Sequence, residues 1–370
     1  MLAKIFDKPP KEITVAVAMS GGVDSSTVAA LLCEAGYKVI GITLQLYDAG
    51  MVSGKKGACC AGIDVYDAKM VANRIGIAHY VLDYESKFRS AVIEDFIDTY
   101  LEGETPTPCI RCNQSVKFKD LLQVAKNLKA DCLATGHYVS KVKGEFGFEM
   151  HKAKDHAKDQ SYFLFGTTDD QLEYLEFPLG NLDKAQTRQH ASRLGLEIAD
   201  KPDSQDICFV TGSYASLIEK MRPNSLRPGI IMHVDGYALG EHKGIIGYTI
   251  GQRRGIGLAF KEPLYVIKID PLNNVLYVGP QSCLYNSKFV VKNTNFLGMK
   301  TDFGDSLEVQ VKIRSTCMPV SAKLYRGHAK GEVIIDLLSP EKSVTPGQAC
   351  VFYDGSRLLG GGWIAKDELK

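Results

Sequence analysis

Strand-like and helix-like segments alternate along the first 138 residues, and this alternation limits the possible fold more than any other feature of the sequence. Short apolar runs at 13–19, 38–47 and 78–84 have the length and composition of buried strands. Between them, residues 25–36 and 65–76 carry apolar side chains at helical spacing. Strands that alternate with helices are typical of parallel βαβ units. We therefore predict an α/β fold with an open parallel sheet covered by helices.

The composition of the chain changes near residue 214. Residues 223–257 are dense in glycine and turn-forming pairs, and short strand-like runs follow at 265–270 and 275–279. Further on, several turn-bounded runs of strand length predict a closing β-barrel. We therefore expect three domains, which are an α/β domain over 1–213, a small central domain over 214–283 and a C-terminal β-barrel over 284–370.

Composition and charge limit the class of protein. The 370 residues are 24% charged and 45% hydrophobic with a net charge of +1, and no apolar run approaches the roughly 18 residues of a membrane helix. Ten cysteines are too few for a disulfide scaffold in a chain of this length. The first apolar run leads into a glycine turn and lacks a signal-peptide cleavage pattern. We expect a globular cytoplasmic protein without membrane contact, and the nearly neutral total leaves a nucleic-acid partner open.

The residues SGGVDSS at 20–26 join the first predicted strand to the first predicted helix. The two glycines let backbone N–H groups turn toward an anion, the serines add hydroxyl donors, and the helix N-terminus adds its positive end. The stretch has neither the Gly-Lys-Ser/Thr of a Walker A loop nor the GxGxxG spacing of a dinucleotide site. It resembles the PP-loop of ATP pyrophosphatases, which implies adenylation of a substrate with loss of pyrophosphate. Asp24 could orient this loop, help to bind Mg²⁺ or simply complement the helix dipole.

Three cysteines lie in polar segments that we predict to be loops. Cys109 and Cys112 form a Cys-x-x-Cys pair in TPTPCIRCN, and Cys208 lies in KPDSQDICFV. Nearby basic residues such as Arg111 and Lys117 would favour the reactive thiolate. A structural zinc site needs four ligands, and the sequence offers no second Cys-x-x-Cys pair to supply them. A thioredoxin-like redox motif would leave the phosphate loop unexplained. The residues alone leave metal binding, redox chemistry and sulfur transfer open.

Seven motifs, taken in order, resemble the bacterial tRNA-specific 2-thiouridylase family. They are SGGVDSS, TPTPCIRCNQSVKF, ATGHY, KDQSYFLF, KPDSQDICFV, GYTIGQRRGIG and TPGQACVFYDG, and together they span almost the whole chain. The resemblance implies ATP-dependent 2-thiolation of the wobble uridine, position 34, of tRNA. In this reaction the C2 oxygen is adenylated with release of pyrophosphate, and sulfur from a cysteine persulfide replaces it, giving 2-thiouridine and AMP. The family combines a PP-loop ATP pyrophosphatase domain, a small central domain and a C-terminal β-barrel, which agrees with the organisation predicted above.

The resemblance also implies roles for individual residues. Cys112 corresponds to the nucleophilic cysteine, and Cys208 corresponds to the cysteine that receives the persulfide. The residues expected to bind ATP are Ala18, Met19, Ser20, Gly21, Gly22, Val23, Asp24, Ser25, Leu44 and Gly136. The residues expected to line the target base or to contact tRNA are Thr107, Pro108, Cys109, His137, Lys158, Asp159, Gln160, Arg314, Ser315 and Gln348.

One position departs from the family pattern. Many members carry an aspartate where this chain has Cys109, so the motif here is Cys-x-x-Cys. Cys109, Cys112 and Cys208 could hold a [4Fe-4S] cluster with one open iron, whereas a persulfide mechanism needs only Cys112 and Cys208. We favour the persulfide. The implied partners are ATP with Mg²⁺, the anticodon stem-loop of tRNA, and a sulfur donor such as a cysteine desulfurase or a sulfur relay protein.

Two rival functions come from other classes. Another PP-loop adenylating ligase would share the ATP loop but would not need reactive cysteines at positions 112 and 208. In a non-catalytic RNA-binding or sulfur-carrier module, the loop 20–26 would be vestigial. Such a module would not release pyrophosphate from ATP in the presence of tRNA.

Overall fold

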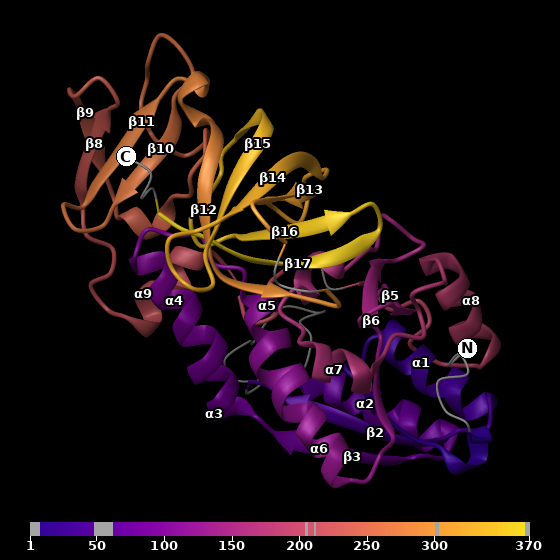
Figure 1. The fold of residues 1–370 in the computed structure, drawn as a ribbon. Helices are drawn as coiled ribbons and strands as arrows, with labels where there is room; N and C mark the ends of the chain where they lie inside the picture. Colours follow the sequence, from indigo (N-terminus) through magenta and orange to yellow (C-terminus); the bar gives the residue numbers. More distant parts are fainter. Residues whose placement is uncertain (1–7, 48–61, 204–205, 211, 300–302, 367–370) are drawn as a thin grey trace.

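The computed structural model describes residues 8–47, 62–203, 206–210, 212–299 and 303–366. Within these ranges the chain forms a parallel sheet, a small mixed sheet and a larger antiparallel sheet (Figure 1). None of the helices in the described ranges is long and apolar enough to cross a bilayer.

The first sheet is parallel throughout, and its strand order is β3-β2-β1-β4-β7. Parallel neighbours need long crossover connections, and the helical segments predicted from the sequence supply most of them. The strands are β1 (Thr14–Ala18), β2 (Lys38–Gln45), β3 (Ala78–Asp83), β4 (Cys132–Thr135) and β7 (Leu175–Glu176). This confirms the predicted open α/β sheet.

Helices cover both faces of this sheet. Alternate residues of β1 point to opposite faces, so Val15 and Val17 pack in one core with Val28 of α1, while Ala16 packs in another core with Phe96 of α4. The helices up to residue 221 are η1 (Pro10–Glu12), α1 (Val23–Glu34), α2 (Gly62–Ile75), α3 (Glu85–Phe88), η2 (Arg89–Ile93), α4 (Glu94–Leu101), α5 (Pro108–Cys112), η3 (Asn113–Leu121), α6 (Leu122–Asn127), η4 (Ser161–Leu164), α7 (Asp169–Tyr174), α8 (Lys184–Arg193) and α9 (Tyr214–Met221).

The small sheet has the strand order β10-β11-β8-β9. Its strands are β8 (Gly229–His233), β9 (Ala238–His242), β10 (Tyr265–Asp270) and β11 (Val275–Gly279), and the short helices η5 (Ile245–Gly247) and η6 (Gln281–Leu284) flank it. The sequence predicted β10 and β11 and a β-rich character for the remainder.

The large sheet closes into a six-stranded antiparallel barrel because β12 pairs with both β15 and β17. In barrel order the strands are β12 (Tyr285–Phe296), β15 (Val333–Lys342), β14 (Val320–Arg326), β13 (Ser306–Lys312), β16 (Ala349–Asp354) and β17 (Arg357–Ile364). Alternating inward residues fill the barrel, among them Val311, Leu324 and Phe352. The predicted C-terminal barrel is confirmed.

A hairpin of the first 213 residues joins the barrel sheet. Strands β5 (Val139–Gly144) and β6 (Gly147–Lys152) pair with each other, and β6 also pairs with β17 through Met150 opposite Leu358. Figure 1 shows this hairpin between the parallel sheet and the barrel. The sequence analysis did not predict it, because the segment 139–152 has no long apolar run.

Candidate active site

The loop after β1 leads into a helix whose first turn lacks a side-chain cap. Gly22 is the N-cap residue of α1, and no side-chain hydrogen bond caps the helix there. The first N–H groups of a helix have no partners within the helix, so this end is suited to an anion. Ser25 Oγ accepts a hydrogen bond of 3.0 Å from the Ser20 N–H, which folds the loop against the first turn.

Two glycines allow neighbouring segments to approach this loop closely. Gly21 has a φ of +71°, and a Cβ placed there would lie 2.0 Å from the Asp64 carbonyl oxygen of α2. A Cβ on Gly136, just beyond β4, would lie 2.7 Å from the Ser25 nitrogen. The structure therefore brings Gly136 and residues 20–25 together, as the expected ATP site requires.

The other expected ATP residues lie at the ends of the loop or on the neighbouring strand β2. Ala18 ends β1 and Val23 begins α1. Met19 donates its N–H to the Ile42 carbonyl at 2.8 Å, which ties the start of the loop to β2. Leu44 lies on β2 and is buried.

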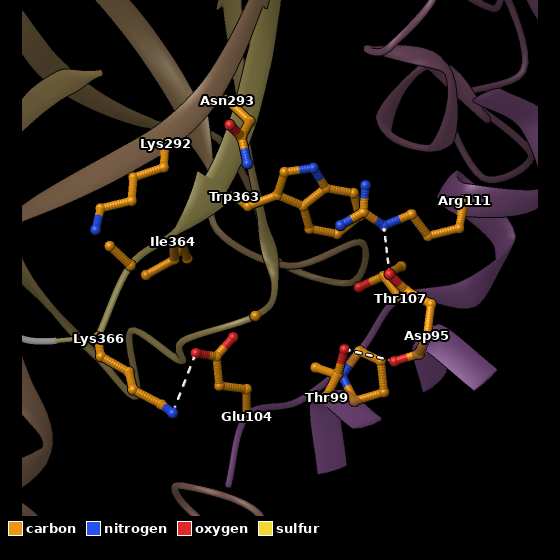
Figure 2. Close-up of a pocket in the computed structure, with 13 residues that line it drawn as sticks. Asp95, Thr99, Glu104, Thr107, Arg111, Lys292, Asn293, Trp363, Ile364 and Lys366 are labelled. Atoms are coloured by element: carbon orange, nitrogen blue, oxygen red, sulfur yellow. Dashed lines mark hydrogen bonds and ion pairs between the residues drawn. The ribbon is translucent and has the colours of Figure 1, made fainter. Parts of the chain in front are cut away.

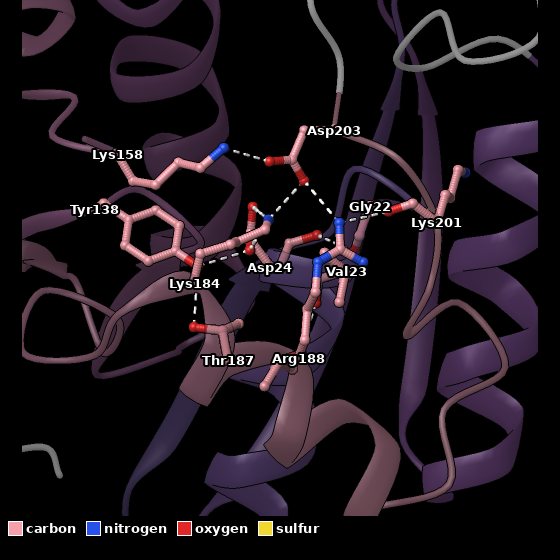
Figure 3. Close-up of polar contacts among 12 residues, drawn as sticks. Gly22, Val23, Asp24, Tyr138, Lys158, Lys184, Thr187, Arg188, Lys201 and Asp203 are labelled. Atoms are coloured by element: carbon pink, nitrogen blue, oxygen red, sulfur yellow. Dashed lines mark hydrogen bonds and ion pairs between the residues drawn. The ribbon is translucent and has the colours of Figure 1, made fainter. Parts of the chain in front are cut away.

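Asp24 lies in a network of charged side chains beside the loop (Figure 3). Lys184 Nζ of α8 lies 2.7 and 2.8 Å from the two Asp24 carboxylate oxygens. The Tyr138 hydroxyl lies 2.9 Å from Asp24 Oδ1, and burial together with the Asp24 charge raises the pKa of Tyr138, so it stays a neutral donor. Both oxygens of Asp24 thus bind a cation of the chain, which favours an orienting role over direct Mg²⁺ ligation.

Asp203 extends this network toward the segment that carries Cys208. Its carboxylate lies 2.7 Å from Lys158 Nζ, 2.7 Å from Lys184 Nζ and 3.3 Å from an Arg188 nitrogen. Burial acts to raise the pKa of Asp203, but hydrogen bonds from Lys158 and Lys184 outweigh it and hold this pKa below its usual value. Asp203 is therefore a carboxylate at neutral pH.

Lys201 connects the loop 20–26 to helix α2. Its Nζ donates to the Gly21 carbonyl at 2.9 Å, to Asp64 at 2.6 Å and to Asp67 at 2.5 Å. Burial acts to lower the pKa of Lys201, yet hydrogen bonds to Asp64 and Asp67 raise it overall. The positively charged Lys201 therefore links the loop to α2.

The cysteine pair lies on a helix, and our prediction of a loop there was wrong. Helix α5 begins at Pro108 and continues through η3 and α6 to residue 127. Proline is well suited to the first position of a helix, because the N–H it lacks would have no partner there. Thr107 is the N-cap residue, Cys109 is exposed and Cys112 is buried.

The surroundings of Cys112 favour the thiol over the thiolate, contrary to our expectation. The residue is only 7% exposed. Burial raises the pKa of Cys112 to about 11, although the Lys117 charge acts in the opposite direction. In the free protein the proposed nucleophile is therefore protonated at neutral pH.

The charge of Arg111 is directed away from the cysteines. Its guanidinium stacks over the Trp363 ring of β17 at 4.3 Å and lies 3.3 Å from Asp95 of α4 (Figure 2). These residues line a cavity of about 270 Å³ between α4, α5 and the barrel, which also includes Thr107 and Lys292.

The remaining two candidate cysteines are accessible. Cys109 is exposed on α5, and Cys208 is half-buried at the edge of the core that contains Phe96 and Phe209. No disulfide bond joins any of the eight cysteines that the structure describes. In the described ranges no three His, Cys, Asp or Glu side chains are placed to hold a metal ion together, so the [4Fe-4S] alternative is not supported.

Four expected tRNA residues form structural contacts near the loop. His137 Nδ1 lies 2.9 Å from Thr135 Oγ1, and burial, followed by Lys117, lowers the pKa of His137 to about 3. Asp159 accepts from the Ala153 N–H and the Ser161 hydroxyl, and Gln160 accepts from the Tyr138 N–H at 2.9 Å. Lys158 pairs with Asp203. Lys158 and Gln160 are thus linked to the loop that is expected to bind ATP, through Asp203 and Tyr138 respectively.

The expected barrel contacts lie at one end of the barrel. Arg314 donates to the Lys342 carbonyl at 3.2 Å and also to the Ser343 carbonyl. Ser315 is exposed in the turn after β13. Gln348, just before β16, has a buried side-chain oxygen without a hydrogen-bond partner.

Sequence reasoning missed Lys184, Arg188, Asp203 and Trp363 as members of the site. Lys184 and Arg188 lie four residues apart on one face of α8, which places both beside the loop, but their sequence resembles an ordinary charged helix. Asp203 was present in the motif KPDSQDICFV and could have been singled out. Trp363 lies far from Arg111 in the sequence, so local pattern does not indicate their contact.

Family profiles match the chain along most of its length. The profile described as "tRNA methyl transferase HUP domain" matches residues 13–212, "tRNA methyl transferase PRC-barrel domain" matches 216–280, and "Aminomethyltransferase beta-barrel domain" matches 286–364. Fold and loop together define the class, a PP-loop ATP pyrophosphatase domain joined to a small β-rich unit and a β-barrel.

Curated relatives identify the family. A protein of Rickettsia felis named tRNA-specific 2-thiouridylase MnmA is 61% identical over 358 residues, which are 96% of this chain and 98% of the relative. The protein of that name from Rickettsia bellii is 60% identical over 359 residues, covering 96% of this chain and 97% of the relative. The chain belongs to the tRNA-specific 2-thiouridylase family.

Solved structures show more distant similarity. An NMN synthetase from Francisella tularensis is 17% identical with a TM-score of 0.34, covering 57% of this chain and 77% of the synthetase. A 4-thiouridine synthetase solved with RNA and ATP is 18% identical with a TM-score of 0.37, covering 57% of this chain and 50% of the synthetase.

Proposed function

We propose that this protein is a tRNA-uridine 2-sulfurtransferase that converts the wobble uridine, position 34, to 2-thiouridine at the expense of ATP. The observation that carries the proposal is a combination of two features in the first domain. The N-terminus of α1 after the loop 20–26 has no side-chain cap, and the helix α5 carries Cys112. The chain also matches named 2-thiouridylases over nearly its full length. The family profiles carry methyl-transfer descriptions, but the relatives at 60% identity and the cysteine motifs favour thiolation.

The first chemical step is adenylation. The uridine O2 attacks the α-phosphorus of ATP, the bond to the β-phosphate breaks, and pyrophosphate leaves with the electron pair. The N–H groups at the start of α1 and the hydroxyls of Ser20 and Ser25 would bind the phosphates. Mg²⁺ would enter with the ATP phosphates and neutralise part of their charge, since Asp24 already binds Lys184.

The second step transfers sulfur. The terminal sulfur of a persulfide on Cys208 attacks C2, and AMP leaves with the former O2. Cys112 then attacks the Cys208 sulfur as its thiolate, the bond to the transferred sulfur breaks, and a Cys112–Cys208 disulfide remains. Alternatively, Cys112 forms this disulfide first and releases hydrosulfide as the attacking species. On either route a thiol reductant restores both cysteines.

The tRNA substrate would contact both the α/β domain and the barrel. Thr107, Pro108 and Cys109 at the start of α5 would line the target base, which must leave the anticodon stack to react. His137, Lys158, Asp159 and Gln160 would contact the tRNA near the loop, and Arg314, Ser315 and Gln348 would do so from the barrel. The unpartnered side-chain oxygen of Gln348 supports such a contact, because buried polar groups usually have a partner.

We also propose the domain boundaries at 213/214 and 283/284, which the ranges of the three profiles support. The protein would act in the cytoplasm, where tRNA is modified. Its sulfur donor would be a cysteine desulfurase or a relay protein that delivers a persulfide to Cys208. The side chain of Cys208 is partly exposed, so such a donor can reach it.

The direct test uses the purified chain with unmodified tRNA, MgATP, cysteine and a cysteine desulfurase. We expect 2-thiouridine at position 34, seen by nucleoside mass spectrometry, with one AMP and one pyrophosphate per product. Cys112→Ser and Cys208→Ser should abolish thiolation, while Cys283→Ser, which changes an exposed cysteine in η6, should not. ATP binding without tRNA-dependent pyrophosphate release would contradict the proposal and favour a non-catalytic module, and full thiolation by both Cys→Ser variants would contradict the cysteine roles.

The iron–sulfur alternative needs its own measurement. Iron and sulfide should be determined after anaerobic purification, with thiolation assayed on the same sample and on Cys109→Ala. Thiolation by iron-free protein and by Cys109→Ala supports the persulfide route. Activity that follows iron content and disappears in Cys109→Ala would overturn it.

A further inference from the structure

Three cationic side chains converge on a single carboxylate beside the phosphate loop. Lys158, Lys184 and Arg188 all contact Asp203, and Lys184 also contacts Asp24 (Figure 3). The group therefore carries one more positive charge than negative charge. We propose that Lys184 and Arg188 form a site for the polyphosphate of ATP and for the pyrophosphate product, and that Asp203 occupies this site until phosphate displaces it. The inference rests on the proposed function and extends its ATP site.

The position of the cluster supports this assignment. Asp24 belongs to the first turn of α1, and Lys184 Nζ lies 2.7 Å from its carboxylate. The Lys184 ammonium therefore lies beside the helix turn whose N–H groups are free to bind an anion. A polyphosphate that binds to these N–H groups is long enough to extend to Lys184 and its neighbours.

The chemistry of the contacts also fits phosphate. Carboxylate and phosphate oxygens accept hydrogen bonds from lysine and arginine in the same way, at similar distances. The side chains of Lys184 and Asp203 are 13% and 22% exposed. Such partial burial strengthens the interactions and still leaves a path for solvent and ligand.

The other hydrogen bonds of Arg188 would hold the surrounding segment in place while phosphate replaces Asp203. Arg188 also donates to the Ala199 carbonyl at 2.5 Å and to the Lys201 carbonyl at 2.9 Å. These bonds do not involve Asp203, so the segment 199–201 stays attached when Asp203 moves away. Arg188 remains in place and can point one nitrogen at the incoming phosphate.

The test compares pyrophosphate affinity among full-length variants without tRNA, by isothermal titration calorimetry. Lys184→Met and Arg188→Gln should each weaken pyrophosphate binding about tenfold. Asp203→Asn removes the competing charge and should strengthen binding several-fold, an effect that loss of a merely structural contact would not produce. The matched control is Glu34→Gln, which removes an ion pair between Glu34 of α1 and Arg193 of α8 at the end of these helices remote from the loop, and should leave affinity unchanged.

Unchanged or weaker pyrophosphate binding by a folded Asp203→Asn protein would overturn the proposal. If this variant does not fold, the deciding measurement is a structure of the wild-type protein with pyrophosphate. Phosphate oxygens at Lys184 and Arg188, with Asp203 displaced, would support the inference, and an Asp203 carboxylate that keeps its contacts would overturn it. Thiolation of tRNA by the wild-type protein is a separate readout, so failure of the proposed function and failure of this site are distinguishable.

Discussion

The local environment of Cys112 determines how reactive this thiol is before substrate binds. Burial raises its pKa to about 11, so at pH 7 only about one molecule in ten thousand carries the thiolate there. We infer that binding of tRNA must change the surroundings of Cys112 before it can attack.

Alkylation measures this state directly. In the free protein, the reaction of Cys112 with iodoacetamide should rise about tenfold per pH unit between pH 7 and 10, because the fraction of thiolate rises in that proportion below the pKa. Peptide mass spectrometry resolves each cysteine, and the exposed Cys283 is the internal reference. A reaction of Cys112 at pH 7 as fast as that of Cys283 would show that the thiol is not masked.

Gly136 provides a second prediction at this scale. In Gly136→Ala the new Cβ would meet the backbone nitrogen of Ser25 at 2.7 Å, and displacing the loop should cost about 1–3 kcal/mol. ATP affinity should therefore fall about tenfold or more, measured by calorimetry. Gly247→Ala is the control, because its Cβ would meet nothing within 4 Å. Equal ATP affinities of Gly136→Ala and wild type would mean that the loop can move aside at little cost.

At the scale of elements, helix α5 shows where sequence reasoning failed. The prolines around position 108 suggested a loop, yet Pro108 begins a helix that runs to residue 127. The helix brings Arg111 to Trp363 of the barrel and turns Cys112 into the core. Trp363 is distant in sequence, and tertiary burial of Cys112 has no local signal, so neither could be predicted from the sequence of the helix.

The stacking of Arg111 on Trp363 should hold α5 in position relative to the barrel. Arg111→Lys keeps the charge but loses the planar contact, so the turnover number for thiolation should fall several-fold while ATP affinity stays unchanged. Trp363→Leu should have the same effect. Arg326→Lys, which alters a similar contact with Phe303 elsewhere in the barrel, is the control. An unaltered turnover number in both Arg111→Lys and Trp363→Leu would show that α5 is positioned by other contacts.

At the scale of the whole molecule, most strands and the order of the three domains could be predicted from the sequence. The contacts that join the domains to one another could not. Strands β1, β2 and β3 and the last barrel strands have short apolar runs bounded by turns, so their positions follow from local pattern. The β5–β6 hairpin and β12 were missed because polar residues interrupt their runs. Likewise the loop residues 20–26 were predicted, whereas the partners Lys184 and Asp203 depend on packing between distant segments.

A large RNA substrate should also meet the central unit. Arg253 and Arg254 are exposed in the glycine-rich turn before β10, and Arg253 lines a cavity of about 390 Å³ there. Replacing each by alanine should weaken tRNA binding and reduce the slope of log affinity against log salt by about 1, since each removes one phosphate contact. Filter binding at several salt concentrations measures this slope. Lys11→Ala, an exposed charge near β1, is the control, and an unaltered slope in both arginine variants would exclude the turn from the tRNA interface.

The β5–β6 hairpin ties these parts together. It begins directly after Tyr138, whose hydroxyl contacts Asp24, and its second strand continues the sheet of β17, which carries Trp363. A protein cut after residue 213 would leave β6 with an open edge where β17 now pairs, and open edges promote aggregation. Shortened versions for biochemistry should therefore keep the barrel, even when only the nucleotide reaction is of interest.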